Sequence, residues 1–141
     1  MPANSTLLLH RLDVDYIMMH IYIMTSTDPR DFLPLHTNWF HILLSLVGCE
    51  QHGYGIMQEV LQRTDGAVRL WPATLYGSLK RLIADGLIEE SDERPAPELD
   101  DARRRYYKLT RLGRRALELE CERLEAMVRM ARKKRKLEAY G

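Results

Sequence analysis

The alternation of hydrophobic and polar positions is clearest between residues 71 and 86. Three leucines and an isoleucine recur there at spacings of four, three and one, on one face of a predicted helix: Leu75, Leu79, Leu82 and Ile83. Pro72 suits the first turn of this helix, and Gly86 suits the position just past its end. The other face is polar, with hydroxyls and cations at Thr74, Tyr76, Ser78, Lys80 and Arg81. Such a helix is typical of an ordinary protein surface, and also of an element that lies in the major groove of DNA.

Two shorter helices are predicted before this one. The first begins at a cap residue, Thr37 or Asn38, and ends at Gly48. It is apolar on two sides, with Phe40, Leu43, Leu44 and Val47 on one side and Trp39, Ile42 and Leu46 on the other. A helix that is apolar on two sides is buried on two sides, so one side can face its own domain and the other a partner subunit. The second helix opens with HGYGI at 52–56 and ends at 64–66.

A β-hairpin is predicted after the 72–85 helix. Residues 87–91 and 104–109 alternate in polarity and flank an acidic loop that contains prolines. Two short helices followed by such a hairpin are typical of a winged helix-turn-helix, in which the hairpin is the wing. Arg104 and Arg105, at the foot of the second strand, can contact phosphate or form ion pairs with acids of the first strand, and the sequence favours neither.

A long last helix is predicted from Thr110, a suitable cap, to about Lys136. Its apolar positions are spaced by four and three and form a short heptad seam: Leu117, Cys121, Leu124, Val128 and Ala131. This seam can fold back on its own domain or pair with a second copy of the chain. The basic run RKKRK at 132–136 is interpreted as a solvated helix end, with a contact to the DNA backbone as the alternative.

The first 32 residues differ from the rest. Residues 16–24, YIMMHIYIM, are too few to span a membrane, have no partner strand signal nearby and lack helix caps. We therefore expect residues 1–24 to pack against nothing, with Met24 as a candidate for the real first residue. The chain divides into an N-terminal extension without stable structure (1–32), a winged domain (33–109), a C-terminal dimerisation helix (110–136) and a tail (137–141).

Charge is distributed unevenly along the chain. The net charge is only +1, but residues 110–141 carry ten cations and five anions, whereas 1–35 and 36–109 are each net −2. A contact with DNA must therefore depend on the local placement of basic residues and not on a positive field over the whole chain.

Several classes of protein are disfavoured. Cys49 and Cys121 form no CxxC pair, and the five histidines have no spacing typical of metal ligands, so we expect no metal, cofactor or disulfide. The sequence contains neither a membrane-spanning apolar run nor a signal-peptide pattern, which favours a cytoplasmic protein without a membrane partner. It also lacks any catalytic spacing of serine, cysteine, histidine or paired carboxylates, so we expect no enzyme.

Four blocks in order resemble the PadR family of bacterial transcriptional regulators: HGYGI at 52–56, PATLYGSLKRL at 72–82, DGLIEE at 85–90 and RRRYYKLTRLGRRAL at 103–117. The resemblance covers residues 33–136 and implies a winged helix-turn-helix whose recognition helix is 72–85. It implies a homodimer held by the C-terminal helix, which packs against the partner's first helix. It further implies a repressor of a two-fold symmetric operator in double-stranded DNA, released by a small aromatic or drug-like effector.

The resemblance also implies roles for single residues. Thr74, Tyr76, Lys80 and Arg81 fall on DNA-facing positions, and Tyr54 falls near the DNA backbone. Trp71 departs from the small or polar residue of the family, which leaves the start of the helix and its phosphate contacts open. With one helix after the wing, the chain resembles the short form of the family, whose effector pocket would lie at the dimer interface.

The sequence thus predicts a mainly α fold with a small β-hairpin, an α+β winged helix-turn-helix followed by a dimerisation helix. The predicted DNA-binding residues are Tyr54, Thr74, Tyr76, Ser78, Lys80, Arg81, Arg104 and Arg105. The predicted dimerisation residues are Trp39, Ile42, Leu46, Leu117, Cys121, Leu124, Val128 and Ala131. The alternative is a winged-helix module that binds another protein and has lost DNA binding, which the net negative charge of 36–109 keeps open.

Overall fold

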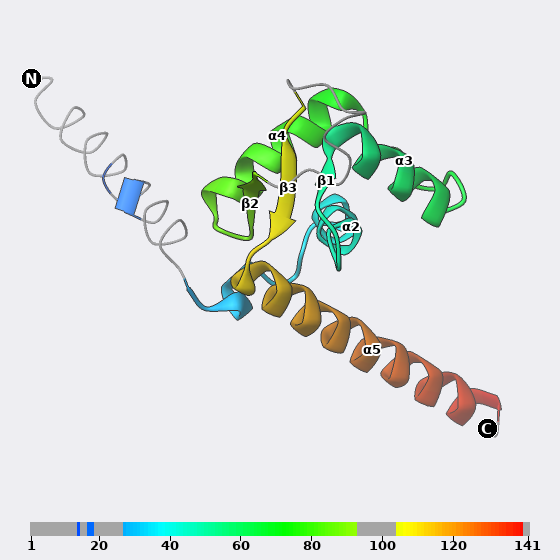
Figure 1. The fold of residues 1–141 in the computed structure, drawn as a ribbon. Coiled ribbons are helices and arrows are strands. Elements are labelled where there is room, and N and C mark those ends of the chain that lie inside the picture. Colours follow the sequence, from blue (N-terminus) through cyan, green and yellow to red (C-terminus); the bar gives the residue numbers. More distant parts are fainter. Residues whose placement is uncertain (1–13, 15–16, 19–26, 93–103, 140–141) are drawn as a thin grey trace, which may run out of the picture.

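The computed structural model describes residues 14, 17–18, 27–92 and 104–139 (Figure 1). Its named elements are, in chain order, η1 (Pro29–Phe32), α2 (Thr37–Ser45), β1 (Gln51–His52), α3 (Gly53–Arg63), α4 (Pro72–Ala84), β2 (Ile88–Ser91), β3 (Tyr106–Leu109) and α5 (Arg111–Ala139). Helices α2, α3 and α4 gather with the strands in one globular part, and α5 projects from it (Figure 1). The predicted class, mainly helical with a small sheet and a C-terminal helix, is confirmed.

Each of the three short helices contributes an apolar face to one core. The buried side chains are Ile42 and Leu43 of α2, Ile56 and Val60 of α3, and Leu75, Leu79 and Leu82 of α4. Tyr107 of the sheet and Ala116 and Leu117 of α5 belong to the same cluster. The winged domain and the start of the last helix therefore form one packed body.

Helix α4 matches the prediction from the residues that bound it. Pro72 is its first residue, and Gly86 follows its end with a φ of +77°. The amide of Gly86 donates to the carbonyl of Ile83 and the amide of Leu87 to that of Leu82, both at 3.0 Å. These two bonds form a Schellman motif, which requires a residue with positive φ such as glycine. Ile83 itself is exposed, against the prediction, because it lies at the edge of the buried face.

Helix α2 differs from the prediction in its ends and in its surroundings. It ends at Ser45, and its cap is His36, whose Nδ1 accepts the amide of Asn38 at 3.1 Å. Residues on both of its apolar sides are buried by the same chain, because α2 packs against α3, α4 and α5. Ile42 and Leu46 are consequently 0% and 2% exposed. The two-sided pattern therefore indicates a central helix, in which Ile42 and Leu46 are buried by the same chain and Trp39 stays half-buried.

The sheet has three antiparallel strands in the order β1-β3-β2, one more than the predicted hairpin. Strand β1 is two residues long, too short for an alternation that a sequence could reveal, and its His52 lies opposite Tyr106. In the central strand both Tyr106 and Tyr107 are buried, so both faces of β3 are covered. Most of the predicted acidic loop lies outside the described residues.

Thr110 joins the end of α4, the sheet and α5. Its hydroxyl donates to the carbonyl of Gly86 at 2.6 Å and accepts the amide of Gly113 at 3.0 Å. Its own amide donates to the carbonyl of Leu87 at 3.2 Å. The predicted cap of the last helix is thus confirmed, and the same residue fastens that helix to the end of α4.

Helix α5 has two halves with different surroundings. Gly113, Ala116, Leu117 and Glu120 are buried in the first half. From Met127 onwards every described residue is exposed. The helix is therefore part of the core at its beginning and a free surface at its end.

The segment before α2 also contacts α5. Helix η1 packs against it, and the amide of Leu35 donates to the buried carboxylate of Glu120, which also accepts from Arg123. This ordered segment begins before the predicted boundary at residue 33. Within residues 1–24 the structure describes only Val14, Ile17 and Met18, all exposed, so the expectation for that stretch lies mainly outside the described residues.

Candidate nucleic-acid interface

The exposed side of α4 brings together most of the predicted DNA-binding residues. Thr74, Tyr76, Lys80 and Arg81 are exposed, and Ser78 is half-buried. The leucines on the opposite side hold the helix in the core, so this polar face is presented to solvent. Ser78 lies at its border, because it is next to the buried face, and is the least accessible of the five.

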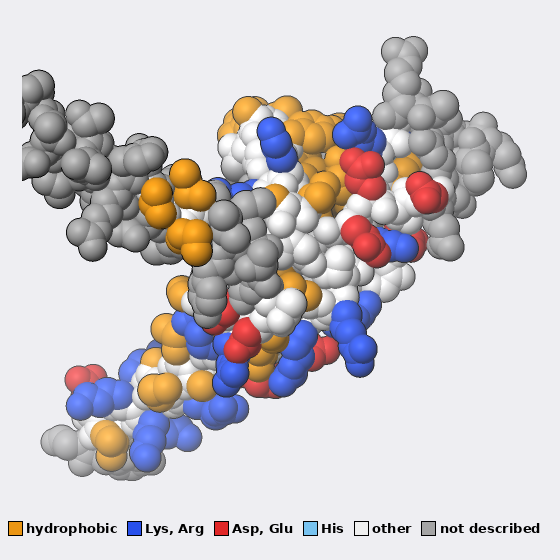
Figure 2. Space-filling view, turned by 90° about the vertical axis from the view of Figure 1, so that its left-hand side faces the viewer, with side chains coloured by type: hydrophobic (Ala, Val, Ile, Leu, Met, Phe, Trp, Pro, Cys, Tyr) orange, Lys and Arg blue, Asp and Glu red, His pale blue; other side chains and the backbone are white. Residues whose placement is uncertain are grey.

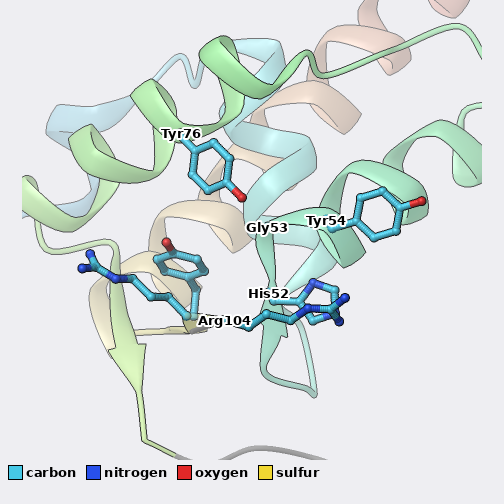
Figure 3. A pocket seen from close by; sticks show the side chains of 7 residues that line it. His52, Gly53, Tyr54, Tyr76 and Arg104 are labelled. Carbon is cyan, nitrogen blue, oxygen red and sulfur yellow. The ribbon is translucent and has the colours of Figure 1, made fainter. Parts of the chain in front are cut away.

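The ring of Tyr76 on α4 lies close to Gly53 at the start of α3. A Cβ atom on Gly53 would lie 3.0 Å from the hydroxyl oxygen of Tyr76 and 3.2 Å from its ring. Figure 3 shows the hydroxyl of Tyr76 directed toward Gly53. A larger residue at position 53 would press on this ring, which would have to shift by a few tenths of an ångström.

A pocket of about 280 Å³ lies where α3, α4 and β3 meet (Figure 3). It is lined by His52, Gly53, Tyr54, Tyr76, Arg104, Arg105 and Tyr107. Burial, with Glu90 and Tyr76 adding to it, raises the pKa of the Tyr107 hydroxyl, which therefore keeps its proton at neutral pH. The guanidinium groups of Arg104 and Arg105 beside tyrosine hydroxyls form a donor set that suits a phosphate oxygen.

His52 organises one wall of this pocket. Its Nδ1 accepts the amide of Gly55 at 3.0 Å and so caps α3, and its ring stacks beside that of Tyr54 at 6.5 Å between centroids. Its Nε2 lies 3.2 Å from Nη1 of Arg104. The HGYGI motif predicted a helix start here but not this role of His52, because histidine is not among the residues that commonly cap helices.

The two wing arginines have different neighbours. Arg104 lies against His52, whereas Arg105 forms an ion pair with Glu90, with Nη1 3.3 Å from Oε1. Lys108 pairs with Glu89 in the same way at 3.7 Å. The ion-pair alternative is thus observed for Arg105. Both partners are exposed, and exposed pairs contribute little stability, so a phosphate can take the place of Glu90.

Lys80 and Arg81 also differ, although they are neighbours on one face. Nε of Arg81 lies 3.9 Å from Oδ2 of Asp85, whose side chain is almost fully buried. Lys80 forms no ion pair with the residues that the structure describes. Removal of Arg81 therefore disturbs the partner of a buried carboxylate, whereas removal of Lys80 changes only the surface charge.

Neither a metal-binding cluster nor a membrane-spanning helix is found in the described ranges. Within them, three or more histidine, cysteine or acidic side chains never lie close enough together to hold a metal ion. None of the helices in those ranges combines the length and the apolar composition needed to cross a lipid bilayer.

Comparison with known proteins identifies the family of this chain. The model of the transcriptional regulator PadR-like family matches residues 42–119. A transcriptional regulator of Mycobacterium tuberculosis, Rv3488, is 38% identical over 89 residues, which are 63% of this chain and 77% of that one. The chain belongs to the PadR-like family of transcriptional regulators.

Solved structures agree with this PadR-like assignment. A PadR family transcription regulator of Clostridium difficile R20291 aligns with a TM-score of 0.58 and 25% identity, over 70% of this chain and 97% of that one. A transcriptional regulator of Clostridium thermocellum aligns with a TM-score of 0.57 and 26% identity, over 68% and 87%. Membership of a family of regulators confirms the expected class, a transcriptional regulator and not an enzyme.

Trp71 does not shift the start of α4. The helix begins at Pro72 as predicted, and Trp71 takes the cap position without a side-chain cap bond. Its ring is 61% exposed, and Cζ of Arg69 lies 5.1 Å from its centroid, a cation–π distance. The ring of Trp71 and the guanidinium group of Arg69 thus lie together just before the first turn of α4.

The predicted dimerisation residues divide into two groups. Ile42, Leu46 and Leu117 are buried within this PadR-like chain, which corrects the prediction that they contact a partner. Leu124, Val128 and Ala131 are exposed, while Trp39 and Cys121 are half-buried. Met127 and Met130 add to the exposed group, and Figure 2 shows hydrophobic side chains between basic ones along the projecting end of the chain.

Proposed function

We propose that this PadR-like chain is a homodimeric repressor that binds a two-fold symmetric operator in double-stranded DNA in the cytoplasm. The observation that carries the proposal is the outer face of α4, with Thr74, Tyr76 and Lys80 exposed on a helix whose other face is locked in the core. Recognition helices of winged folds read base edges from such a face, and neighbouring cations hold the phosphates.

The second half of α5 supports the homodimer. Four large apolar residues are exposed there: Leu124, Met127, Val128 and Met130. A stripe of this kind on a projecting helix is covered in solution when two copies pair about a two-fold axis. Two recognition helices related by that axis would meet two equal half-sites of DNA.

An effector site at the dimer interface follows from the family resemblance. The two methionines of the stripe favour it, because their flexible side chains adapt to aromatic ligands. We expect anilinonaphthalene sulfonate, used as a small aromatic probe, to bind the dimer and to weaken its operator binding. Probe binding that leaves operator affinity unchanged would contradict release by such a ligand.

Salt dependence of DNA binding tests the proposed role of α4. Each phosphate contact that is lost lowers the slope of log affinity against log salt by about one. We expect this change for Lys80→Ala with stability unchanged within about 0.5 kcal/mol, since the side chain is exposed. Arg115→Ala, an exposed cation of α5 outside the basic run at 132–136, is the matched control and should keep the slope of the wild-type chain.

Three outcomes would decide against the proposal. If the chain binds no DNA, the protein-interaction alternative becomes the better explanation. If Lys80→Ala and Tyr76→Phe both bind as the wild-type chain does, α4 does not lie in the groove. If deletion of the gene lowers expression from its operator in a reporter assay, the chain is an activator and not a repressor.

A further inference from the structure

Gly77 lies in the middle of the recognition helix without a structural reason for a glycine. Its φ is not in the left-handed region, and a Cβ atom placed there would meet no described atom within 4 Å. The glycines at the packed contacts behave differently. A Cβ on Gly53 would press on Tyr76, and one on Gly113 would overlap the carbonyl of Leu87. The described fold therefore explains Gly53 and Gly113, but not Gly77.

A glycine in this position weakens the helix. Glycine has the lowest helix propensity of all residues except proline, because its backbone loses the most freedom on folding. Residues 76–78 are helical and Gly77 is exposed, so no buried contact offsets this loss. The missing side chain has to be explained by something outside the described fold.

The position of Gly77 on the helix indicates which outside partner explains the missing side chain. At 3.6 residues per turn, Gly77 faces directly away from the buried Leu75, Leu79 and Leu82. Ala73, one turn earlier, also has a very small side chain, and Lys80 lies one turn later. The centre of the outer face is therefore flat, with a cation beyond it.

We propose that Gly77 lets the base edges of DNA approach the backbone of α4, and that it is a specificity-determining position of this PadR-like regulator. A Cβ atom would hold the helix away by about 1.5 Å, one carbon–carbon bond length. Thr74 is short, so its hydroxyl reaches a base edge only when the helix lies deep in the groove. The inference rests on the proposed binding of DNA by α4.

If DNA approaches the backbone at Gly77, a substitution there should raise the stability of the protein and weaken its binding to the operator. Gly77→Ala should raise the Tm by about 3 °C, because alanine is the best helix former. It should also weaken binding to operator duplexes, selected from a random library by the wild-type chain, by about tenfold or more. Binding to a scrambled duplex should stay within about twofold, since phosphate contacts dominate non-specific binding.

Gly77→Val extends the test to a larger side chain, for which the loss of operator affinity should be greater still. Gln62→Ala, an exposed position of α3, is the control for a stabilising change elsewhere on the surface. It should leave both affinities unchanged. Fluorescence anisotropy of labelled duplexes gives the affinities, and thermal unfolding gives the Tm.

Each other result would overturn the inference in a recognisable way. Operator binding that is unchanged in Gly77→Ala means that DNA does not approach this position. A lower Tm means that the fold itself requires the glycine. Equal losses on operator and scrambled duplexes mean a general effect without specificity. A wild-type chain that selects no sequence from the library would instead refute the proposed function, and this inference with it.

Discussion

The two halves of α5 are one continuous helix, yet they face different surroundings. In the first half, Gly113 lies against the backbone of Leu87 and Glu120 is buried beside Leu35. In the second half, Leu124 and Met130 are exposed, the latter to 65%. Buried positions of the first half belong to the fold, whereas the apolar positions of the second half have no partner among the described residues. The difference separates residues that hold the domain together from residues available to a second copy.

The largest expected effect is a loss of stability when the packing of the first half of α5 is disrupted. Gly113→Ala places a Cβ atom on the carbonyl of Leu87, a backbone atom that cannot move aside without shifting the sheet. We expect a loss of at least about 3 kcal/mol in the free energy of unfolding, measured with urea. Gly77→Ala makes the same change at an exposed helical position and should raise the free energy of unfolding. Equal stabilities of the two variants would contradict this account of Gly113.

The next largest effect is a loss of dimerisation when the exposed apolar stripe in the second half of α5 is disrupted, with the fold intact. Leu124→Glu places two carboxylates in the proposed dimer contact, which should weaken dimerisation about a hundredfold, or about 2.7 kcal/mol. Sedimentation at micromolar concentration measures the change, and the circular dichroism spectrum should be unaltered. Leu137→Glu is the control, because this exposed residue lies beyond the seam. A wild-type chain that is monomeric at that concentration would disprove the dimer.

A moderate effect is expected at Glu120. Its carboxylate accepts the amide of Leu35 and a bond from Arg123. Glu120→Ala leaves a buried amide without its acceptor, which should lower the free energy of unfolding by about 1–3 kcal/mol. Glu122→Ala, an exposed change on the same helix, should have almost no effect. A similar loss in both variants would mean that removing a carboxylate from α5, and not the loss of the buried bond, explains the effect.

The smallest effect concerns Cys121, at the border of the two halves. Burial, with Glu125 and then Glu120 adding to it, raises the pKa of its thiol, so less reactive thiolate is present at a given pH. Iodoacetamide at pH 8 should therefore alkylate Cys121 several-fold more slowly than the exposed Cys49, as measured by mass spectrometry. The rate at Cys121 should rise in Leu124→Glu if the dimer covers it. Equal rates for the two cysteines would contradict the sheltered position.

The sequence predicted the elements that have strong local signals. Pro72 and Gly86 bound α4 as expected, and the spacing of Leu75, Leu79 and Leu82 identified its buried face. Thr110 caps α5 as predicted, because its hydroxyl satisfies an amide of the first turn. These features depend on residues close together in the chain, and such residues are what a pattern can reveal.

Features that depend on distant contacts were missed. Ile42 and Leu46 were predicted to contact a partner, but α3, α4 and α5 of the same chain surround α2. Strand β1 exists only because its two residues pair with β3. A sequence reveals that a helix is apolar on two sides, but not which neighbour covers each side.

The sequence predicted the polar face of α4, but not the contacts that surround it. The polar face of α4 followed from helical periodicity. The contact of Tyr76 with Gly53, the position of Arg104 beside His52 and the pairing of Arg81 with Asp85 depend on packing and on side-chain direction. The pairing of Arg81 matters most, because it makes that residue less suitable than Lys80 for a test of binding alone.

The hydrogen bonds of Thr110 bear on the spacing of the two half-sites in the proposed operator. They tie the end of α4 to the first turn of α5, so neither helix can turn alone without breaking them. In a dimer joined along α5, the crossing of two helices then sets the distance between the two recognition helices, with no flexible linker to adjust it. B-DNA turns by roughly 35° per base pair, so one added base pair carries a half-site around the duplex. Such a dimer would read the helical phase of its operator as well as its bases.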